Sequence, residues 1–546
     1  MYSSNITIKS FKLRFIHINK MIRLLSSILA LFSVTTIYAQ QNTIPKLVVG
    51  ITIDQLRGDY LEHFKQSFGE KGFKRLLSQG VVYNQMSYNF PSLDKASTIA
   101  TIYTGSVPFY HGIVNDKKIS YQDYTEVSSF SDDKFMGNFT SEKLSPLPLK
   151  VSTITDELKI ASNGKSDVFA FAPDASQALS SGGHAASGAF WIEDFSGRWA
   201  TTTFYTTHHQ FVDQYNRSNE SLNVKGNSLL WKPKLPLESY NAFPYTQNLV
   251  NFQHNLSTGK NNNYRLLKQT PFINEEVRTM GINAIESISL GKRSYPDFLA
   301  LTFYAGSFDN ALDKNYSIEV QDIYHRLDED IAQVIDAVDK AVGLENALIF
   351  VVSSGYHNEQ EVYPKDARFP GGDFRPDRCE ALLNMYLMAI YGRENWIKKY
   401  HNEQIFFDRK LIEDKKIDFR ELQEQAADFL IQFSGVQDVV TSYQMLHGAY
   451  NEAIQVYKNG FHRGVTGDLF IELQPGWRVV TEKKLTNHQR VRSNAIIAPA
   501  IFFGNHLKPQ KVDRIIDATE IAPSVTHRLR IRAPNASSTT ILKELL

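Results

Sequence analysis

The sequence has a single cysteine, Cys379, among its 546 residues. One thiol excludes an intrachain disulfide and any zinc site built from several cysteines. Neither charge is in excess, since 59 Lys and Arg residues balance 58 Asp and Glu residues. The chain therefore has no global field that favours nucleic acid or an anionic membrane. It also lacks internal repeats, low-complexity stretches and a Gly-rich phosphate loop of the P-loop or dinucleotide type.

Long hydrophobic runs are also absent, because no stretch reaches 18 apolar residues. Near the N-terminus, Lys20 and Arg23 precede a short apolar run, Leu24 to Val34, and Ala39 ends a plausible cleavage site. This pattern predicts a secretory signal peptide over residues 1–39, with 1–20 an upstream extension if Met21 is the true start. We expect a periplasmic or secreted mature chain with no membrane span; the alternative is an uncleaved N-terminal anchor.

What the sequence does contain is an ordinary globular composition, 42% hydrophobic and 21% charged. Continuous apolar runs predict buried parallel strands, and long amphipathic stretches between them predict helices. The expected strands are 46–53, 81–88, 167–171, 297–304, 347–353 and 498–503, and the expected helices include 72–79, 97–103, 319–342 and 417–434. This alternation predicts an α/β fold with a mostly parallel sheet covered by helices on both faces.

Two segments interrupt the alternation, residues 201–290 and 365–485. We interpret them as cap insertions at the carboxyl edge of the sheet, where α/β folds bind ligands. The core then comprises 45–200, 291–364 and 486–546; the alternative is small independent domains on linkers. Aromatic residues of the two caps could stack on a glycan or could form the core of the caps: Tyr205, Tyr215, Trp231, Tyr240, Tyr245 and Trp396.

A series of short motifs lies in a fixed order along the chain. In sequence they are Asp54 after the first strand, Phe90-Pro91, Thr104-Gly105-Ser106-Val107-Pro108, His111-Gly112-Ile113, Gly183-His184-Ala185, Arg326-Leu327-Asp328, Gly460-Phe461-His462, Pro475-Gly476-Trp477 and Ala522-Pro523-Ser524. Together they resemble the alkaline phosphatase superfamily, in particular the phosphate-irrepressible alkaline phosphatases and the type I phosphodiesterase/nucleotide pyrophosphatase branch. The resemblance covers essentially the whole mature chain and implies an alkaline-phosphatase-like core.

The resemblance also implies two zinc ions about 4 Å apart and a Thr or Ser nucleophile. The nucleophile is expected nine residues before Thr104, where this chain has Lys95, preceded by Asp94. Ser92 and Ser97 flank this position out of register. Lysine cannot form the phosphoester that this mechanism requires, so no catalytic residue is in register.

Of the six Asp and His zinc ligands that the resemblance implies, Asp54 and His488 are in register. A shifted alignment adds Asp309, Asp313 and His357 as candidates. Asn115 matches a phosphate-contacting Asn, whereas the expected Lys-x-Arg pair is replaced by Pro173-Asp174-Ala175. Asp94, Lys95 and Asn115 are therefore the candidate binding residues.

The leading interpretation is a secreted pseudophosphatase that has kept the fold, lost the nucleophile and most zinc ligands, and acts by binding. No cofactor is then expected, and the Lys95 ammonium could occupy the place of a zinc ion beside Asp54, Asp94 or Asp309. The alternative is a divergent phosphomonoesterase or phosphodiesterase. It would hold zinc or another divalent cation at a degenerate one-metal site, with Arg490 or Arg492 as a second cationic group. A glycan or a protein that binds at the cap is the expected partner, and no binding of nucleic acid is expected.

Overall fold

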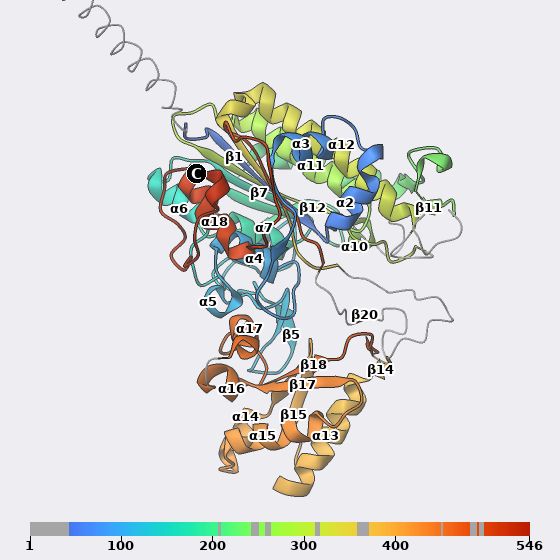
Figure 1. The fold of residues 1–546 in the computed structure, drawn as a ribbon, viewed down its shortest axis with the longest axis vertical. Coiled ribbons are helices and arrows are strands. Elements are labelled where there is room, and N and C mark those ends of the chain that lie inside the picture. The colour runs from blue at the N-terminus through green and yellow to red at the C-terminus, as the bar shows by residue number, and fades with distance from the viewer. Residues whose placement is uncertain are drawn as a thin grey trace, which may run out of the picture. The chain divides into compact units, whose positions relative to one another are not determined.

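The computed structural model describes residues 43–205, 209–241, 250–256, 264–311, 317–357, 371–448, 451–480, 489–490 and 496–546. Residues 44–546 form one compact unit, and a ten-stranded sheet runs through it (Figure 1). The strand order is β22 (Gln510–Val512), β2 (Val81–Tyr83), β21 (Ala500–Gly504), β13 (Ala347–Ser353), β1 (Leu47–Asp54), β12 (Asp297–Tyr304), β7 (Val168–Ala172), β8 (Gly188–Ile192), β9 (Trp199–Thr202) and β6 (Gly137–Asn138).

The middle of this sheet is parallel. Strand β1 pairs in parallel with β12 and β13, and β7 pairs in parallel with β12 and β8. The late strand β21 runs antiparallel to both of its neighbours. The predicted α/β fold with a mostly parallel sheet is therefore confirmed, and β12 and β13 begin and end at the predicted residues.

Helices cover both faces of the sheet, and every residue of β1 is therefore buried. Leu47, Val49, Ile51 and Ile53 point into one apolar cluster, and Val48 points into another. The first cluster is closed by α2 (Gly58–Phe64), α3 (Phe73–Gln79), α11 (Pro271–Ile288) and α12 (Ile318–Val342). The second is closed by α4 (Ser97–Thr104), α6 (Ile154–Ala161), α7 (Ala175–Gly182) and α18 (Ile521–Arg528).

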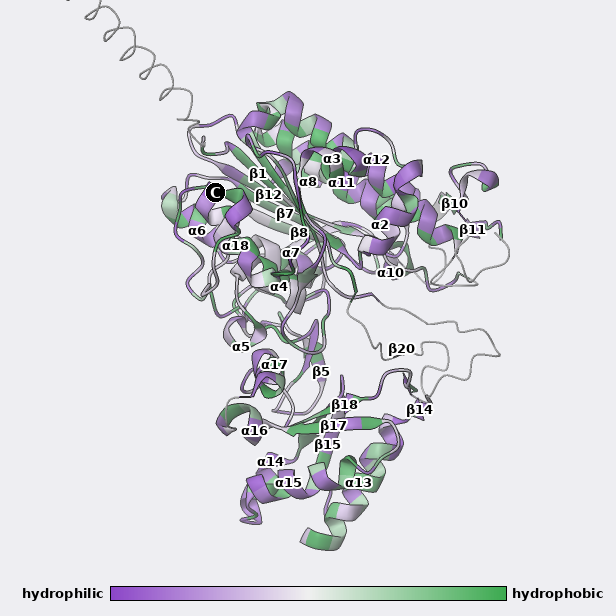
Figure 2. Ribbon diagram, viewed as in Figure 1, coloured by the Kyte–Doolittle hydropathy of each residue, from purple (hydrophilic) through white to green (hydrophobic). Residues whose placement is uncertain are grey.

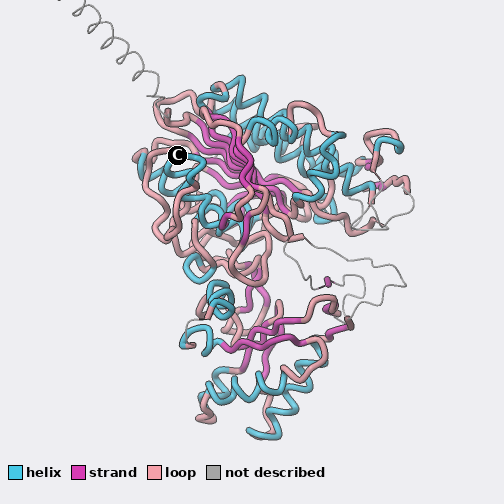
Figure 3. The backbone as a smooth tube through the Cα atoms, viewed as in Figure 1, coloured by secondary structure: helices cyan, strands magenta, loops and turns pink. Residues whose placement is uncertain are grey.

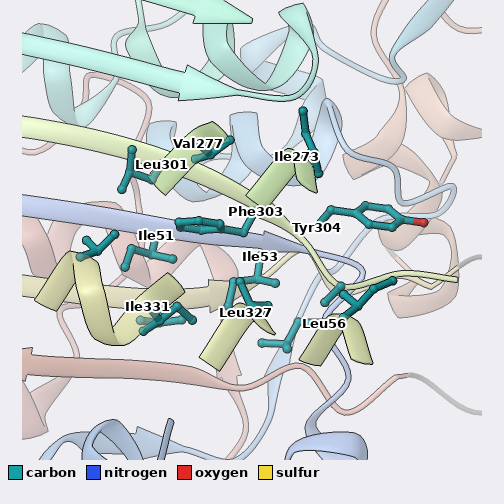
Figure 4. Packing of buried hydrophobic residues seen from close by; sticks show 14 of the residues in the cluster. Ile51, Ile53, Leu56, Ile273, Val277, Leu301, Phe303, Tyr304, Leu327 and Ile331 are labelled. Carbon is teal, nitrogen blue, oxygen red and sulfur yellow. The ribbon is translucent and has the colours of Figure 1, made fainter. Parts of the chain in front are cut away.

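Figure 4 shows the first cluster from close by. Ile51 and Ile53 of β1 and Leu301 and Phe303 of β12 lie between side chains of α11 and α12. All of these side chains are fully buried. This packing fixes the position of the carboxyl ends of β1 and β12, where the candidate site begins.

Residues 371–480 contain a second, smaller sheet with an apolar core of its own (Figure 3). Its four strands are β15 (Ile397–His401), β16 (Gln404–Phe407), β18 (Leu469–Leu473) and β17 (Val436–Thr441). The helices of this segment are α13 (Pro376–Tyr391), α14 (Arg409–Asp414), α15 (Phe419–Leu430), α16 (Ser442–His447) and α17 (Glu452–Gly460). Green apolar stretches on α13 and α15 alternate with purple polar ones, as expected of helices that bury one side (Figure 2).

The core contacts this smaller sheet through a hairpin formed by β4 (Lys117–Ile119) and β5 (Glu126–Ser128). Tyr121 and Tyr124 in the hairpin loop donate hydrogen bonds to the carbonyl oxygens of Thr466 and Phe407. Arg409 stacks over the ring of Tyr121 at 4.0 Å from its centroid. No helix among the described residues is both long and apolar enough to cross a membrane.

Candidate functional site

The site lies where the parallel strands end. Because β1, β12, β13 and β7 run in the same direction, their carboxyl ends meet at one edge of the sheet. Asp54 ends β1, Ser354 and Tyr356 follow β13, and Asp174 follows β7. These are the residues from which the local chemistry is built.

Asp54 is buried and surrounded by hydrogen-bond donors of the protein. Its carboxylate accepts from the Ser354 hydroxyl at 3.0 Å, from the Gln177 amide at 3.3 Å, and from the Tyr356 hydroxyl. Burial raises the pKa of Asp54 to about 6, although the Tyr356 hydrogen bond and the charge of Lys95 act in the opposite direction. Neutral donors of the chain thus take up the oxygen atoms that a metal ion would need.

Lys95 stands at the position of the expected nucleophile and points at carboxylates. Its ammonium lies 2.6 Å from Asp174 Oδ2 and 3.5 Å from Asp116 Oδ2. Burial alone would lower the pKa of Lys95, but the charges of Asp174, Asp116 and Asp54 raise it above its usual value. The partners predicted for Lys95 are therefore corrected: its ion pairs are with Asp174 and Asp116, and Asp54 acts on it through space.

Asp174 links Lys95 to a second ammonium group, that of the buried Lys268. Lys268, which directly follows α10 (Tyr264–Leu267), lies 2.8 Å from Asp174 Oδ1 and 2.6 Å from Asp194 Oδ1. Burial would raise the pKa of Asp174, but Lys268 and Lys95 together hold it well below its usual range. The result is a row of alternating charges, Lys95–Asp174–Lys268–Asp194, which we call the ion-pair row.

Asp94 and Asn115 shape the loop that carries Lys95. The Asp94 carboxylate accepts from the backbone N–H groups of Ala96 and Ser97 and from the Ser97 hydroxyl at the start of α4. The Asn115 amide donates to the carbonyl oxygen of Ser92 at 3.3 Å. Both side chains are thus engaged by backbone groups of this loop and its neighbours. The Ser97 hydroxyl is similarly held by Asp94, so it is not poised as a substitute nucleophile.

The remaining candidate ligands do not assemble around Asp54 in the part of the chain that the structure describes. Asp309 is exposed and accepts a hydrogen bond from Gln269 at 2.9 Å. The buried His357 ring packs against Tyr60 of α2, with ring centroids 6.2 Å apart. Asp313, His488 and Arg492 lie outside the described residues, as does the side chain of Arg490.

The described residues of the site do not by themselves fit the zinc pair that the resemblance implies. Among the described residues, no group of three or more His, Cys, Asp or Glu side chains could hold a metal ion. Asp54 is satisfied by uncharged donors, and an ammonium already sits against Asp174 and Asp116. A dication placed beside Lys95 would meet a like charge, which opposes its binding.

The sequence reasoning missed several residues that build this site. They are Asp116, Gln177, Lys268, Ser354 and Tyr356. Gln177, Ser354 and Tyr356 follow predicted strands within six residues, so strand position could have indicated them. Lys268 carried no such signal, because its segment had no recognisable periodicity.

The aromatic cap residues turn out to be packing residues. Tyr205, Tyr215, Trp231, Tyr240 and Trp396 are all buried. These five rings therefore offer no stacking surface to a glycan; Tyr245 lies outside the described residues. The Trp231 indole and the Tyr240 hydroxyl both donate to the buried carboxylate of Asp322 on α12.

Comparison with known proteins places this geometry in a family. The sequence profile of the type I phosphodiesterase/nucleotide pyrophosphatase family matches residues 48–495. Alkaline phosphatase PhoV of Synechococcus elongatus is 29% identical, over 94% of this chain and 94% of its own. Alkaline phosphatase PafA of Elizabethkingia meningoseptica is 28% identical, over 90% and 93%. The crystal structure of wild-type PafA superposes with a TM-score of 0.81, at 27% identity, and covers 92% of this chain and 99% of the other. The chain belongs to the type I phosphodiesterase/nucleotide pyrophosphatase family, within the alkaline phosphatase superfamily.

Proposed function

We propose that this protein is a pseudophosphatase, a family member that binds rather than hydrolyses and works in the periplasm or outside the cell. One observation carries the proposal. The ammonium of Lys95, the residue that the resemblance aligns with the nucleophile, is paired with Asp174 and Asp116. The activity named for PhoV and PafA is the expectation that family membership gives, and the chemistry of this site argues against it.

Phosphoryl transfer through a covalent intermediate needs an atom with a free lone pair. The neighbouring carboxylates keep Lys95 protonated at neutral pH, because they raise its pKa above the ordinary value. A protonated amine has no lone pair to donate. Lys95 therefore replaces the oxygen nucleophile without supplying a nitrogen nucleophile.

The charge that would meet a phosphate group is also unfavourable. The loop after β7 presents Asp174 where the resemblance implies a Lys-x-Arg pair. Both nearby ammonium groups are already neutralised, since Lys95 and Lys268 share Asp174 and each has a further carboxylate. Among the described residues around Asp174, an entering phosphate dianion would meet carboxylates and two ammonium groups that are already paired.

The proposal is tested by hydrolysis assays on the purified mature chain. The substrates are p-nitrophenyl phosphate and bis(p-nitrophenyl) phosphate, each with zinc, calcium or manganese added, and metal content is measured on the same sample. We expect no turnover above the buffer blank and fewer than two zinc ions per chain. Asp54→Asn is the control, because activity from a contaminating phosphatase would survive it. Turnover that Asp54→Asn abolishes would refute the proposal and favour the one-metal hydrolase.

A further inference from the structure

Helix α13 has an apolar outer face. On its inner side, Leu383 and Leu387 point into the apolar core of residues 371–480. A helix at a protein surface normally carries polar residues on the side that faces away from such a core. On α13, by contrast, every exposed residue between Arg378 and Gly392 is apolar: Ala381, Met385, Ala389 and Ile390. Met385 is 63% exposed and Ile390 46%.

The neighbouring helix α15 has the usual polar outer face. It packs against α13, where the rings of Tyr386 and Phe429 stack with their centroids 4.3 Å apart. The exposed residues of α15 are all charged: Arg420, Glu421, Glu424 and Asp428. The apolar outer face is therefore particular to α13 and is not shared by the segment around it.

Opposite charges lie at the two ends of this face. Asp377, Ala381, Met385, Ala389 and Arg393 follow one another at intervals of four residues, a spacing that forms one ridge along a helix. Asp377 lies in the first turn of α13, and Arg393 follows its C-cap residue. Both are exposed, and neither forms an ion pair in the part of the chain that the structure describes. The ridge thus has an acid at one end, a base at the other, and two alanines placed symmetrically about Met385.

A ridge of this kind is complementary to a second copy of itself in the antiparallel direction. A twofold axis at Met385 brings Asp377 to Arg393 of the partner subunit, and Ala381 to Ala389 of the partner subunit. The small alanine side chains allow two helices to approach closely, and the flexible methionine fills the space between them. In a parallel pair, like charges would meet at both ends.

We propose that the outer face of α13 is the interface of a weak homodimer with twofold symmetry, in which the two copies of this helix pack antiparallel. One pair of helices buries an area near the lower limit of specific interfaces, roughly 1,000 Å² in total, so we expect a Kd of about 10 µM. This inference is independent of the proposed function, because α13 carries none of the residues of the candidate site.

The first test exchanges the charges and measures sedimentation velocity of the purified mature chain up to about 200 µM, well above the expected Kd. Asp377→Arg and Arg393→Asp each replace two attractions in the dimer by two repulsions, so each variant alone should have a Kd at least about tenfold higher. An equimolar mixture of the two variants should dimerise as the unaltered protein does, because both contacts of the mixed dimer are again between opposite charges. In a parallel pair, neither variant alone would weaken the dimer.

The second test places the twofold axis. Met385→Glu brings two carboxylates together and should also raise the Kd at least about tenfold. Ile160→Glu is the matched control, because Ile160 on α6 is 61% exposed and should leave the Kd unchanged. Met385→Cys should form a disulfide-linked dimer on mild oxidation, whereas Ile160→Cys should not; the native Cys379 is buried. All of these substitutions replace exposed side chains, so Tm should be unchanged.

Each outcome decides the matter. Loss of the dimer in both charge variants, with recovery in their mixture, supports the interface. A chain that stays monomeric at about 200 µM overturns the proposal. A dimer that Met385→Glu leaves intact overturns it as well, and so does a mixture of the charge variants that does not recover.

Discussion

Replacing Asp174 by Asn should be among the most damaging single changes at the site. Asp174 binds two ammonium groups, at 2.6 Å for Lys95 and 2.8 Å for Lys268. The amide keeps the size of the side chain but removes its charge. Two protonated lysines then face one another across a neutral group.

The size of the effect follows from the burial of the three side chains. They are 10% to 27% exposed, so the pairs are only partly screened by water. Breaking a buried pair costs about 3–5 kcal/mol when the partner is left without a counter-charge. Lys95 keeps Asp116 and Lys268 keeps Asp194, so we expect a loss near the lower end, about 3 kcal/mol.

The assay is urea unfolding of the unaltered protein, Asp174→Asn, Lys95→Met and the double variant. The double-mutant cycle isolates the Lys95–Asp174 interaction, for which we expect a coupling of about 2 kcal/mol. The pH dependence adds a second check. In the unaltered protein the pKa of both lysines is raised. Their contribution is therefore constant below about pH 10 and is lost only above that.

In Asp174→Asn each lysine loses the carboxylate that they share but keeps another, Asp116 for Lys95 and Asp194 for Lys268. The pKa of each lysine in the folded variant is therefore raised less than in the unaltered protein, and less stability is lost as the pH rises past about 10. The gap in stability between the variant and the unaltered protein should be constant from about pH 7 to pH 10 and should narrow above that. A coupling below about 0.5 kcal/mol, or a gap that widens above about pH 10, would refute the ion-pair row as a structural unit.

Three further predictions test other parts of the chain. Burial raises the pKa of Glu276 to about 7, so its carboxyl stays protonated to a higher pH in the folded than in the unfolded state. The free energy of unfolding, measured with urea, should therefore fall by about 2 kcal/mol from pH 5 to pH 8. Glu276→Gln should remove this dependence on pH. Asp468→Asn weakens its contacts with Arg409 and the Phe407 N–H, so limited proteolysis should cleave residues 371–480 sooner than in the unaltered protein; equal cleavage rates would contradict this. Gly50→Ala places a methyl group 2.5 Å from the Phe350 ring and 2.6 Å from the Tyr103 hydroxyl. Calorimetry should therefore show a free energy of unfolding that is lower by about 2 kcal/mol. An unchanged Tm would mean that the two rings can move apart.

Much of the central sheet was predictable, because its strands are continuous apolar runs that end at polar residues. The boundaries of β12 and β13 agree with the prediction, and α12 begins one residue before the predicted helix. The assignment of Lys95 to the nucleophile position comes from the family resemblance and stays a prediction. The strand predicted over 81–88 is instead two short strands, β2 and β3 (Met86–Ser87), which pair in different sheets.

The partners of Lys95 could not be predicted, because they depend on where loops from separate strands meet. The sequence indicates Asp174 only as a replacement for an expected cationic pair, and it gives no indication that Asp116 and Lys268 belong to the site. Hydrophobic periodicity indicates which face of a helix or strand is buried, but it does not indicate which distant polar side chains meet. Lys95 and Asp174 are 79 residues apart in the sequence, and Asp174 and Lys268 are 94 residues apart. The exposed position of Asp309 was similarly beyond the reach of a spacing argument.

The ion-pair row also has an evolutionary consequence. If the proposed function holds, phosphate chemistry at this site would require at least a hydroxyl at position 95 and a cation near position 174. Either change made first breaks ion pairs: without Lys95, Asp116 loses its ion pair and Asp174 keeps Lys268 alone, and without the carboxylate of Asp174, Lys95 keeps Asp116 and Lys268 keeps Asp194. Each single step costs stability before any activity is gained, and natural proteins have little stability to spare. Because Lys95 and Asp174 neutralise each other, neither can be replaced alone without weakening the fold.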